Sequence, residues 1–439
     1  MKKILVLGAG LVAGPLVRYL LKVDGFHVTV ASRTVSKAET LIGGAANGTA
    51  LSLNVKDEVE LGRLVSEHDL SISLLPYVYH PVVARLCVEH GKQMVTTSYV
   101  KDEMRALDGS AKDAGVILLN EIGVDPGIDH MSAMQVIHRI AENGGTLVSF
   151  TSNTGGLPAP DANDNPMGYK FSWAPRGVVL AGKNPAKYLV DGEVVDVPGP
   201  ELFAHHWPCE IVGFGTLEVY PNRDSMPYID SYSIPGVNSM FRGTLRYPGW
   251  CNTLKAIVDL DLLDETERDD LAGLTYGQWL ARKLGSDGTD LKRDLADRLG
   301  IPVEAKPITD LEWLGLVGDE PIPSADTTDL DVVASRMLKK MPYAPGERDM
   351  LVMQHEFVAE YPDRTEKVTS TMIDYGIPNG DSSMSRLVGL PAAIAARMIL
   401  QGEIALIGVH TPVIPEIYDP VLAELDRLGV SFRETTETV

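Results

Sequence analysis

A glycine-rich turn near the start of the chain has the residue types and spacing of a pyrophosphate-binding site. Gly8 and Gly10 follow an apolar run, Ile4 to Leu7, and precede an amphipathic stretch that begins near Leu11. The first glycine permits a tight turn, the second lets the backbone approach a phosphate, and free N–H groups at the helix start attract the anion. An ordinary strand-to-helix turn is the alternative, but a strand, this turn and a helix are the context that the motif requires. The turn therefore predicts a dinucleotide-binding domain.

The end of the next predicted strand, His27 to Thr34, carries a cation where the adenosine ribose of a bound dinucleotide lies. Ser32, Arg33 and Thr34 stand there, in place of the Asp or Glu that is typical of an NAD site. A guanidinium and two hydroxyls suit a 2′-phosphate better than a bare ribose hydroxyl. We therefore predict NADP rather than NAD, with a solvated surface arginine as the plainer alternative.

Six strands are expected to position these groups. Apolar or alternating runs separated by helical stretches predict one doubly wound parallel sheet, whose ligands bind at the carboxyl ends of the strands. The runs that contain these strands are Ile4 to Leu7, His27 to Thr34, Ala50 to Val55, His68 to His80, Lys92 to Val100 and Val116 to His130. The residues predicted to contact the cofactor at this edge are Gly8, Gly10, Leu11, Val12, Ser32, Arg33, Thr34, Asn54, Val55, Leu75, Thr97, Ser98, Val124, Asp125 and Pro126.

The pattern changes from about Gly145, where strand-like segments are joined by Pro/Gly-rich loops. This favours a second domain on a mixed or antiparallel sheet. Between about Trp250 and Lys340, apolar residues recur at three- and four-residue spacing, as in helices. Two alternating strands then precede a long apolar helix, which we expect to pack near the cofactor domain. The strand segments are LVSFTSNTGG, EVVDVPG, CEIVGFGTLEVYPN, SYSIPG, DMLVMQHEFVAEY and EKVTSTMIDYG, and the helix is MSRLVGLPAAIAARMIL.

Because 439 residues exceed what one hydrophobic core usually supports, two or three domains are expected, and the patterns divide this α/β protein into three. A variant Rossmann domain at residues 1–130 is joined by C-terminal helices at about 383–439. A mixed-sheet domain takes residues 131–250 and 341–382. A small helical domain takes residues 251–340.

Charge and cysteine content narrow the classes of partner. The chain has 60 acidic and 39 basic residues and a formal net charge of -21, which makes nucleic acid and anionic membranes poor partners. Its cysteines, Cys87, Cys209 and Cys251, lie far apart without metal-ligand spacing, so no metal site is predicted. No leader pattern or long apolar run is recognised, and we therefore expect a soluble, cytoplasmic protein.

Several longer strings resemble one family, the L-glutamate-forming saccharopine dehydrogenases, and the likeness spans nearly the whole chain. The strings are MKKILVLGAGLV, VTTSYV, NEIGVDPGIDH, GGLPAPDANDNPMGYKFSW, YPNRDS, RGTLRYPG and GERDMLVMQHEF. The resemblance implies NADP-linked, reversible reduction of the imine that 2-aminoadipate 6-semialdehyde forms with L-glutamate, which gives saccharopine. It also implies a homodimer, a mixed-sheet domain for substrate binding and dimerisation, and a cofactor contact at Ser172.

Saccharopine carries several carboxylates and two amines, so its site needs cations and an acid–base group. The resemblance assigns the cations to Arg223 in YPNRDS and Arg246 in RGTLRYPG. Each arginine could instead form a structural ion pair. The full set expected to bind substrate is Ser98, Tyr99, Asp125, Arg223, Thr244, Leu245 and Arg246.

Asp125 is the first candidate for proton transfer, because a carboxyl group after the last strand of the sheet can relay the proton as imine and amine interconvert. Tyr99 is the second candidate. Asp125 could also cap the helix that PGIDH begins. His80 and His130 are expected to be hydrogen-bonded structural residues. Fungal members of the family look to have a cysteine before GGLPAP, where this chain has Thr154; Thr154 is not assigned a catalytic role.

Two other functions compete with this interpretation. A carboxynorspermidine-type dehydrogenase would keep the Rossmann half and alter the substrate strings, which are intact here. A sensor or scaffold that binds NADP without turnover would lack the acid–base residue or the arginines, yet Asp125, Tyr99, Arg223 and Arg246 are all present. The physiological direction, lysine synthesis or lysine breakdown, is left open.

Overall fold

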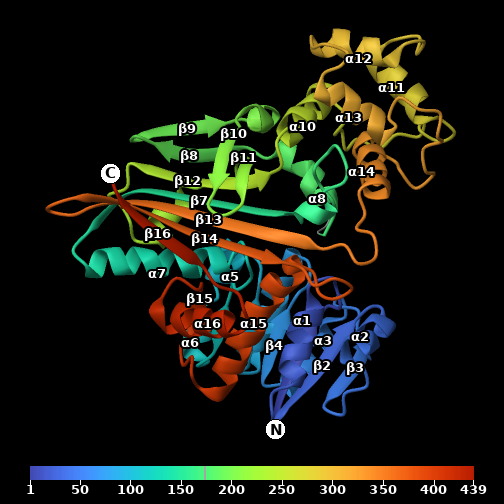
Figure 1. The fold of residues 1–439 in the computed structure, drawn as a ribbon. Helices are drawn as coiled ribbons and strands as arrows, with labels where there is room; N and C mark the ends of the chain where they lie inside the picture. The colour runs from blue at the N-terminus through green and yellow to red at the C-terminus, as the bar shows by residue number, and fades with distance from the viewer. Residues whose placement is uncertain (173–174) are drawn as a thin grey trace. The chain divides into compact units, whose positions relative to one another are not determined.

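The computed structural model describes residues 1–172 and 175–439, and its backbone divides into two compact units. Unit 1 comprises Met1–Gly145 and Gly380–Arg433. Unit 2 comprises Thr146–Asn379 and Glu434–Val439. Figure 1 shows the chain from the blue N-terminal strands to the red C-terminal segment. Trp173, the last residue of one of the strings that carry the family resemblance, lies outside the described residues.

Unit 1 is built on a parallel sheet in the order β15-β6-β5-β4-β1-β2-β3, and the predicted Rossmann topology is confirmed. The predicted six strands are joined by a seventh, β15, a three-residue strand that gave no recognisable pattern. The strands are β1 Lys2–Leu7, β2 Phe26–Ser32, β3 Gly48–Ser52, β4 Leu70–Ser73, β5 Gln93–Thr96, β6 Ile117–Leu119 and β15 Gly408–His410. The chain reverses its strand order between β1 and β4, where such sheets bind ligands.

Helices surround this sheet in the usual alternation with strands. They are α1 Ala13–Leu21, α2 Val35–Ile42, α3 Glu58–Glu67, η1 Tyr77–Tyr79, α4 His80–Glu89, α5 Asp102–Arg105, α6 Asp108–Asp113, α7 Ile128–Glu142, α15 Ser383–Gln401 and α16 Pro415–Arg427. The apolar α15 packs against α1, and a side chain at Gly389 would meet the carbonyl oxygen of Val12 at 2.7 Å. By length and hydropathy α15 could also cross a membrane, but 67% of that window is buried, as in a core helix.

Unit 2 contains a mixed sheet in the order β10-β11-β12-β7-β13-β14-β16, with β8 paired to β12 and to β9. The pair β7 and β12 is parallel, whereas β11 pairs antiparallel with β12 and β13 pairs antiparallel with β7. The predicted second, mixed sheet is confirmed. The strands are β7 Thr146–Pro158, β8 Ala186–Val190, β9 Glu193–Val197, β10 Trp207–Ile211, β11 Gly215–Pro221, β12 Ser239–Arg246, β13 Asp349–Glu360, β14 Thr365–Tyr375 and β16 Arg433–Thr438.

One predicted strand is wrong. The segment SYSIPG, residues 231–236, begins at the last residue of a short helix, α9 Pro227–Ser231, and continues as turns. Pro227 favours this helix start because its ring fixes φ, and Ser233 adopts a φ of 55°, which interrupts any extended run.

The helical segment does not form a core of its own. Its helices are α10 Trp250–Asp259, α11 Tyr276–Leu284, α12 Leu291–Leu299, α13 Lys306–Leu314 and α14 Asp329–Lys340. Trp250, Trp279 and Leu311 share one buried cluster with Leu157 of β7 and Leu217 of β11. Residues 251–340 therefore belong to the same compact unit as the mixed sheet, in contrast to the predicted separate domain.

Two other boundaries differ from the prediction. The helix α7 lies in unit 1, whereas residues from 131 onward were assigned to the mixed-sheet domain. The C-terminal segment expected to be helical ends in β16, which adds to the mixed sheet beside β14. The remaining short helices of unit 2 are η2 Pro160–Ala162, α8 Pro175–Val179, η3 Leu180–Lys183 and η4 Gly199–Ala204.

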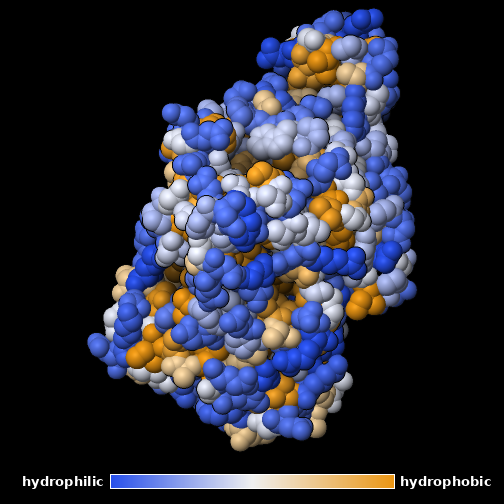
Figure 2. All heavy atoms as spheres, turned by 60° about the vertical axis from the view of Figure 1, so that its left-hand side comes forward, coloured by the Kyte–Doolittle hydropathy of each residue, from blue (hydrophilic) through white to orange (hydrophobic). Residues whose placement is uncertain are grey.

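Polar residues dominate the visible surface. On the face drawn in Figure 2, hydrophilic residues cover most of the area and apolar residues occur in separate groups. Within β16, every residue is exposed, and the segment RETTET consists of charged residues and threonines. Charged side chains on an edge strand discourage pairing with other chains.

Candidate functional site: a dinucleotide pocket and an arginine pocket

A pocket of about 390 Å³ lies in unit 1 at the carboxyl edge of the parallel sheet. Segments that follow β1, β2, β3 and β4 form its walls, which places it at the change of strand order. Eight of the predicted cofactor contacts line it: Gly8, Gly10, Ser32, Arg33, Thr34, Asn54, Val55 and Leu75. Leu11, Val12, Thr97, Ser98, Val124, Asp125 and Pro126 do not line this pocket, so their contact with a cofactor stays a prediction.

The glycine turn has the geometry that a pyrophosphate requires. Gly8 has a φ of 111°, and a Cβ there would lie 3.1 Å from the carbonyl oxygen of Leu74, so a side chain is excluded. A Cβ at Gly10 would meet nothing within 4 Å, which means that this backbone faces open space. The helix α1 begins at Ala13 without a side-chain cap. The Ala13 N–H donates to the Gly10 carbonyl oxygen at 3.2 Å and Pro15 has no N–H, which leaves the N–H of Gly14 for an anion. The turn therefore fits a dinucleotide phosphate.

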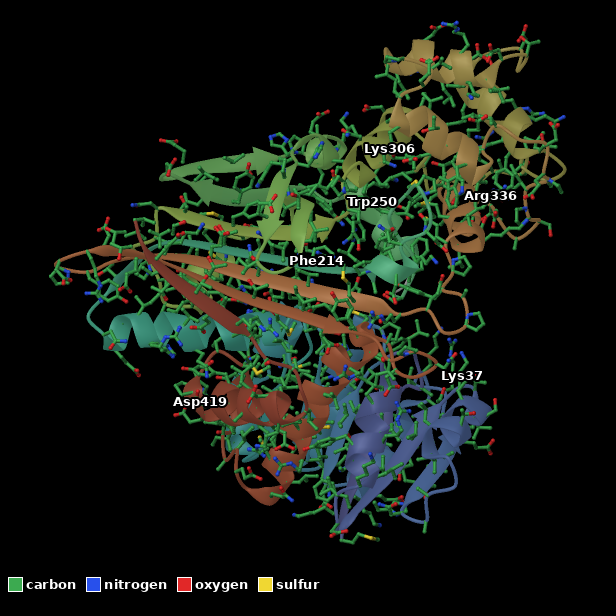
Figure 3. All side chains as sticks on the ribbon, in the orientation of Figure 1. Lys37, Phe214, Trp250, Lys306, Arg336 and Asp419 are labelled. Carbon is green, nitrogen blue, oxygen red and sulfur yellow. The ribbon has the colours of Figure 1, made fainter. Side chains whose placement is uncertain are left out.

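Three cations line the adenosine end of this pocket. Arg33 was predicted, whereas Lys37 and Lys56 were not. Lys37 belongs to the first turn of α2, four residues after Arg33, and it is labelled in Figure 3. The sequence could have indicated Lys37, because the first turn of the helix after β2 faces the same strand end as Arg33. The three charges suit a 2′-phosphate.

These cations predict a cofactor preference. We expect NADPH to be favoured over NADH by about tenfold or more in kcat/KM, since a charge-assisted contact contributes roughly 1.5 to 3 kcal/mol. Arg33→Ala should remove most of this preference and Lys37→Ala a part of it. Steady-state kinetics with both cofactors test this. Lys22→Ala, an exposed lysine of the same unit outside this pocket, should leave the ratio unchanged. Equal kcat/KM for both cofactors in the unmodified protein would contradict the prediction.

Tyr99 and Asp125 meet beside this edge. The Tyr99 hydroxyl donates a hydrogen bond to Asp125 Oδ1 at 3.0 Å, which joins the segments after β5 and β6. The helix α7 begins at Ile128 with Gly127 at the N-cap position, and Asp129 Oδ1 accepts the Gly127 N–H at 2.6 Å. Asp125 therefore lies before the cap position, and the alternative that it caps this helix is not supported. The pair has the geometry for sharing a proton.

The two histidines are hydrogen-bonded, buried residues, as the structural interpretation predicts. His80 contacts the Ser73 hydroxyl at 2.8 Å through Nδ1 and the Ser98 hydroxyl at 2.9 Å through Nε2. Burial lowers the pKa of His80 to about 4, so the ring is neutral at pH 7. His130 pairs with Glu121 at 2.8 Å, and both side chains are buried.

The lowered pKa of His80 predicts acid sensitivity. The histidine pKa in an unfolded chain is about 6.5, so the unfolded state takes up this proton first, and stability falls between about pH 6.5 and about pH 4. At pH 5 the loss attributable to His80 is about 2 kcal/mol relative to pH 7. Urea unfolding at both pH values tests this: His80→Gln should flatten the dependence by that amount, whereas His90→Gln, an exposed histidine of the same unit, should not. The prediction would be contradicted if the free energy of unfolding fell by the same amount from pH 7 to pH 5 in His80→Gln as in the unmodified protein.

A second pocket, of about 250 Å³, lies in unit 2 and brings together Arg223, Thr244 and Arg246. Arg223 lies two residues after the end of β11 and has a φ of 57°, and its carbonyl oxygen accepts the Lys187 N–H. Arg246 ends β12. The sequence predicted all three as substrate contacts, and the strand pairing of β11 with β12 accounts for their proximity.

Arg246 is the more deeply placed of the two arginines. It is 8% exposed, Nη1 donates to the Leu245 carbonyl oxygen, and Nε has no hydrogen-bond partner among the described residues. Its guanidinium lies 5.0 Å from the Tyr169 ring centroid and 5.8 Å from that of Trp250. A buried cation with an unused donor is a site for a carboxylate.

Leu245 does not line this pocket: its side chain is fully buried and its carbonyl oxygen accepts a hydrogen bond from Arg246, so its predicted substrate contact stays a prediction. Thr154 pairs with Thr244 in the parallel register of β7 and β12, and its buried Oγ1 has no hydrogen-bond partner within the described part of the chain. Ser172 also lies in unit 2. Its predicted cofactor contact stays a prediction.

Sequence reasoning missed the aromatic lining of the arginine pocket. Tyr220 lines it, and burial raises the pKa of Tyr220, which keeps the phenol neutral. Asn222 lines it as well. Both lie in the string VYPNRD, within three residues of Arg223, so the motif that carried the arginine also contained its neighbours.

His206, Glu218 and Cys251 form a cluster whose possible metal-ligand atoms lie within 4.8 Å of one another, a proximity that the wide sequence spacing did not predict. Glu218 already accepts the N–H groups of Gly249 at 2.9 Å and Cys251 at 2.7 Å. These bonds satisfy the start of α10, which explains the buried carboxylate without a metal.

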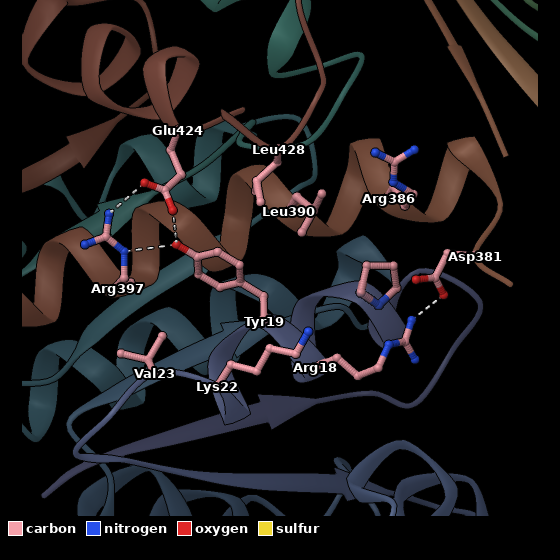
Figure 4. A pocket seen from close by; sticks show the side chains of 11 residues that line it. Arg18, Tyr19, Lys22, Val23, Asp381, Arg386, Leu390, Arg397, Glu424 and Leu428 are labelled. Carbon is pink, nitrogen blue, oxygen red and sulfur yellow. Dashed lines mark hydrogen bonds and ion pairs between the residues drawn. The ribbon is translucent and has the colours of Figure 1, made fainter. Parts of the chain in front are cut away.

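A cavity of about 600 Å³ between α1, α15 and α16 is larger than either pocket, but no predicted site residue lines it. Figure 4 shows the side chains that join these helices. The Tyr19 hydroxyl donates to Glu424 and accepts from Arg397, and Arg18 pairs with Asp381. Burial raises the pKa of Tyr19 to about 12. These contacts attach the C-terminal helices to the Rossmann sheet.

A Rossmann sheet with this phosphate-binding turn and cationic pocket defines an NADP-binding protein of the dehydrogenase class. Residues 4–119 match the family model of the saccharopine dehydrogenase NADP binding domain, and residues 123–430 match that of the saccharopine dehydrogenase C-terminal domain. The chain therefore belongs to the saccharopine dehydrogenase family, as the sequence motifs predicted.

Full-length relatives agree with this assignment. Saccharopine dehydrogenase [NADP(+), L-glutamate-forming] of Schizosaccharomyces pombe is 40% identical, with 99% of each chain covered. The solved apo structure of the L-Glu-forming saccharopine dehydrogenase from Saccharomyces cerevisiae has a TM-score of 0.93 at 38% identity, with 100% of both chains covered. Mitochondrial alpha-aminoadipic semialdehyde synthase of Bos taurus is 40% identical, and the match spans 47% of that longer protein.

Proposed function

We propose that this chain is an NADP-dependent oxidoreductase that interconverts saccharopine with L-glutamate and 2-aminoadipate 6-semialdehyde. The observation that carries the proposal is the arginine pocket, where Arg246 is buried with an unused donor beside Arg223. A substrate rich in carboxylates supplies the missing acceptors. The names of the full-length relatives support the same reaction.

Separate residues are proposed to bind the cofactor and to bind the substrate. When bound, NADPH supplies the hydride that reduces the imine carbon–nitrogen double bond. Gly10 and the start of α1 hold the pyrophosphate, and Arg33 with Lys37 holds the 2′-phosphate. Arg223 and Arg246 bind carboxylates and orient the substrate.

The proton is assigned to Asp125 and Tyr99. As hydride reaches the imine carbon, the nitrogen needs a proton, and the carboxyl group and phenol at 3.0 Å from each other can deliver and recover it. In the reverse direction the same pair accepts the proton from the secondary amine. Ser98, held by His80, would add a hydroxyl donor at the same edge.

Absorbance of NADPH tests the proposal directly. Purified protein should oxidise NADPH when L-glutamate and 2-aminoadipate 6-semialdehyde are both present, and should reduce NADP⁺ with saccharopine. Omission of either amine or aldehyde should stop the reaction. NADPH binding without turnover would instead favour the sensor or scaffold function. Turnover with a diamine in place of glutamate would favour a carboxynorspermidine-type dehydrogenase.

Assembly and location complete the proposal. We infer a cytoplasmic homodimer that acts on small molecules, without nucleic acid or membrane partners. The net charge of -21 supports the exclusion of polyanionic partners, and the family resemblance supports the dimer. Light scattering during size-exclusion chromatography tests the dimer: a mass near twice 47.6 kDa is expected.

A further inference from the structure

Glu121 holds the backbone on both sides of Tyr99. Its N–H donates to the carbonyl oxygen of Ser98 at 3.2 Å, and its Oε1 accepts the N–H of Val100 at 2.8 Å. Tyr99 is the residue between Ser98 and Val100, so one residue engages the acceptor before it and the donor after it. These two hydrogen bonds, which we call the Glu121 bracket, leave the Tyr99 backbone little freedom to shift along the edge of the sheet.

His130 fixes the other oxygen of Glu121. The distance from His130 Nε2 to Glu121 Oε2 is 2.8 Å, with 2% and 9% of the two side chains exposed. His130 belongs to the first turn of α7, which begins three residues after Asp125. Because both carboxylate oxygens are engaged in a buried place, the carboxylate cannot rotate without losing one of these contacts. The Tyr99 and Asp125 segments are thus tied to the same helix.

The backbone of Glu121 is itself unusual. Its φ is 58°, a left-handed conformation that glycine or asparagine adopts at lower cost than glutamate. Residues in this conformation persist where the surroundings determine them, and they cluster at functional sites. What glutamate supplies here, and glycine does not, is a carboxylate that reaches both Val100 and His130.

We propose that Glu121, locked by His130, is a positioning residue that sets the Tyr99 hydroxyl against Asp125. The catalytic consequence rests on the proposed function, in which Tyr99 and Asp125 move the proton. The bracket itself does not depend on that function, because it is a pair of hydrogen bonds from the Glu121 N–H and side chain to the backbone on either side of Tyr99. A proton-transfer pair loses effectiveness when its groups are displaced by fractions of an ångström.

Two neutral amides that differ by one methylene test the proposal. Glu121→Asn tolerates the left-handed backbone but is too short to reach Val100. Glu121→Gln keeps an oxygen acceptor for Val100, and its N–H₂ group can donate to His130 Nε2 in the tautomer that carries the ring proton on Nδ1. We expect Glu121→Asn to lower kcat at least ~10-fold and Glu121→Gln to stay within ~3-fold of the unmodified protein. The Kd for NADPH should not change in either variant.

A double-substitution cycle with Tyr99→Phe separates positioning from general stability. If Glu121 acts through Tyr99, then adding Glu121→Asn to Tyr99→Phe should lower kcat by no more than ~2-fold further. Equal reductions in both backgrounds, or an unchanged kcat for Glu121→Asn, would overturn the proposal.

Amide hydrogen exchange of residues 97–101, followed by mass spectrometry, gives a readout without turnover. The Val100 amide should exchange faster in Glu121→Asn and at the original rate in Glu121→Gln. Unchanged exchange in Glu121→Asn would also overturn the bracket. An unmodified protein that shows no imine reduction would refute the proposed function, while the exchange result would still decide whether Glu121 holds Tyr99.

Discussion

Asp125→Asn is expected to lower kcat by about 10²-fold or more, the scale seen when a positioned acid–base group is removed. The substitution is nearly isosteric, and an amide oxygen can still accept the hydrogen bond from the Tyr99 hydroxyl, which is 3.0 Å from Asp125 Oδ1. The helix start at Gly127 should persist, because Asp129 accepts that N–H. Binding of NADPH and saccharopine should therefore survive while proton transfer does not. Steady-state kinetics tests the loss of turnover, and calorimetry tests whether NADPH and saccharopine still bind.

Asp129→Asn is the matched control. It removes a buried carboxylate four residues away on the same segment, and its effect should fall on stability rather than on kcat. Near-normal kcat in Asp125→Asn would remove Asp125 from the mechanism and leave Tyr99 as the acid–base residue.

Local sequence was sufficient for the cofactor side of the site. The turn at Gly8 and Gly10 and the cation at Arg33 lie within short strings whose order of strand, turn and helix is itself the signal. Asn54 and Val55 in the segment after β3 were predicted as well, whereas the neighbouring Lys56 was missed; the pairing of β2 with β3 places that segment beside Arg33. The strand β15 was missed because three residues show no periodicity.

The sequence-based predictions that were wrong concern structure that depends on contacts between residues distant in sequence. Helical spacing in residues 251–340 correctly indicated helices, but spacing cannot reveal that Trp250 and Trp279 pack into the core under the mixed sheet. Similarly, the acidic RETTET segment became an edge strand because β14 offers it backbone partners, and not because of its own β-propensity. The Glu121 bracket and its His130 contact join residues from three segments and could likewise not be predicted from the sequence.

Because Arg246 is buried, its substitution is expected to have a large effect on substrate binding. Arg246→Met keeps an unbranched apolar side chain against Tyr169 and Trp250 but removes the guanidinium. Saccharopine should then lose a bidentate partner in a buried place, and its Kd should rise about 30-fold or more, which corresponds to about 2 kcal/mol. The Kd for NADP should remain within about twofold, because the dinucleotide pocket lies in unit 1.

Arg242→Met provides the control for this measurement. Arg242 lies on the same strand at a spacing of four residues, is 3% exposed and stacks 4.2 Å from the Tyr228 ring centroid, yet it does not line the arginine pocket. Both substitutions remove a buried guanidinium from β12, so both should reduce stability, but only Arg246→Met should weaken saccharopine. Calorimetric titration with saccharopine separates the outcomes. If the Kd is unchanged in Arg246→Met and also in Arg223→Met, both arginines are structural, and the carboxylates of the substrate must be bound elsewhere.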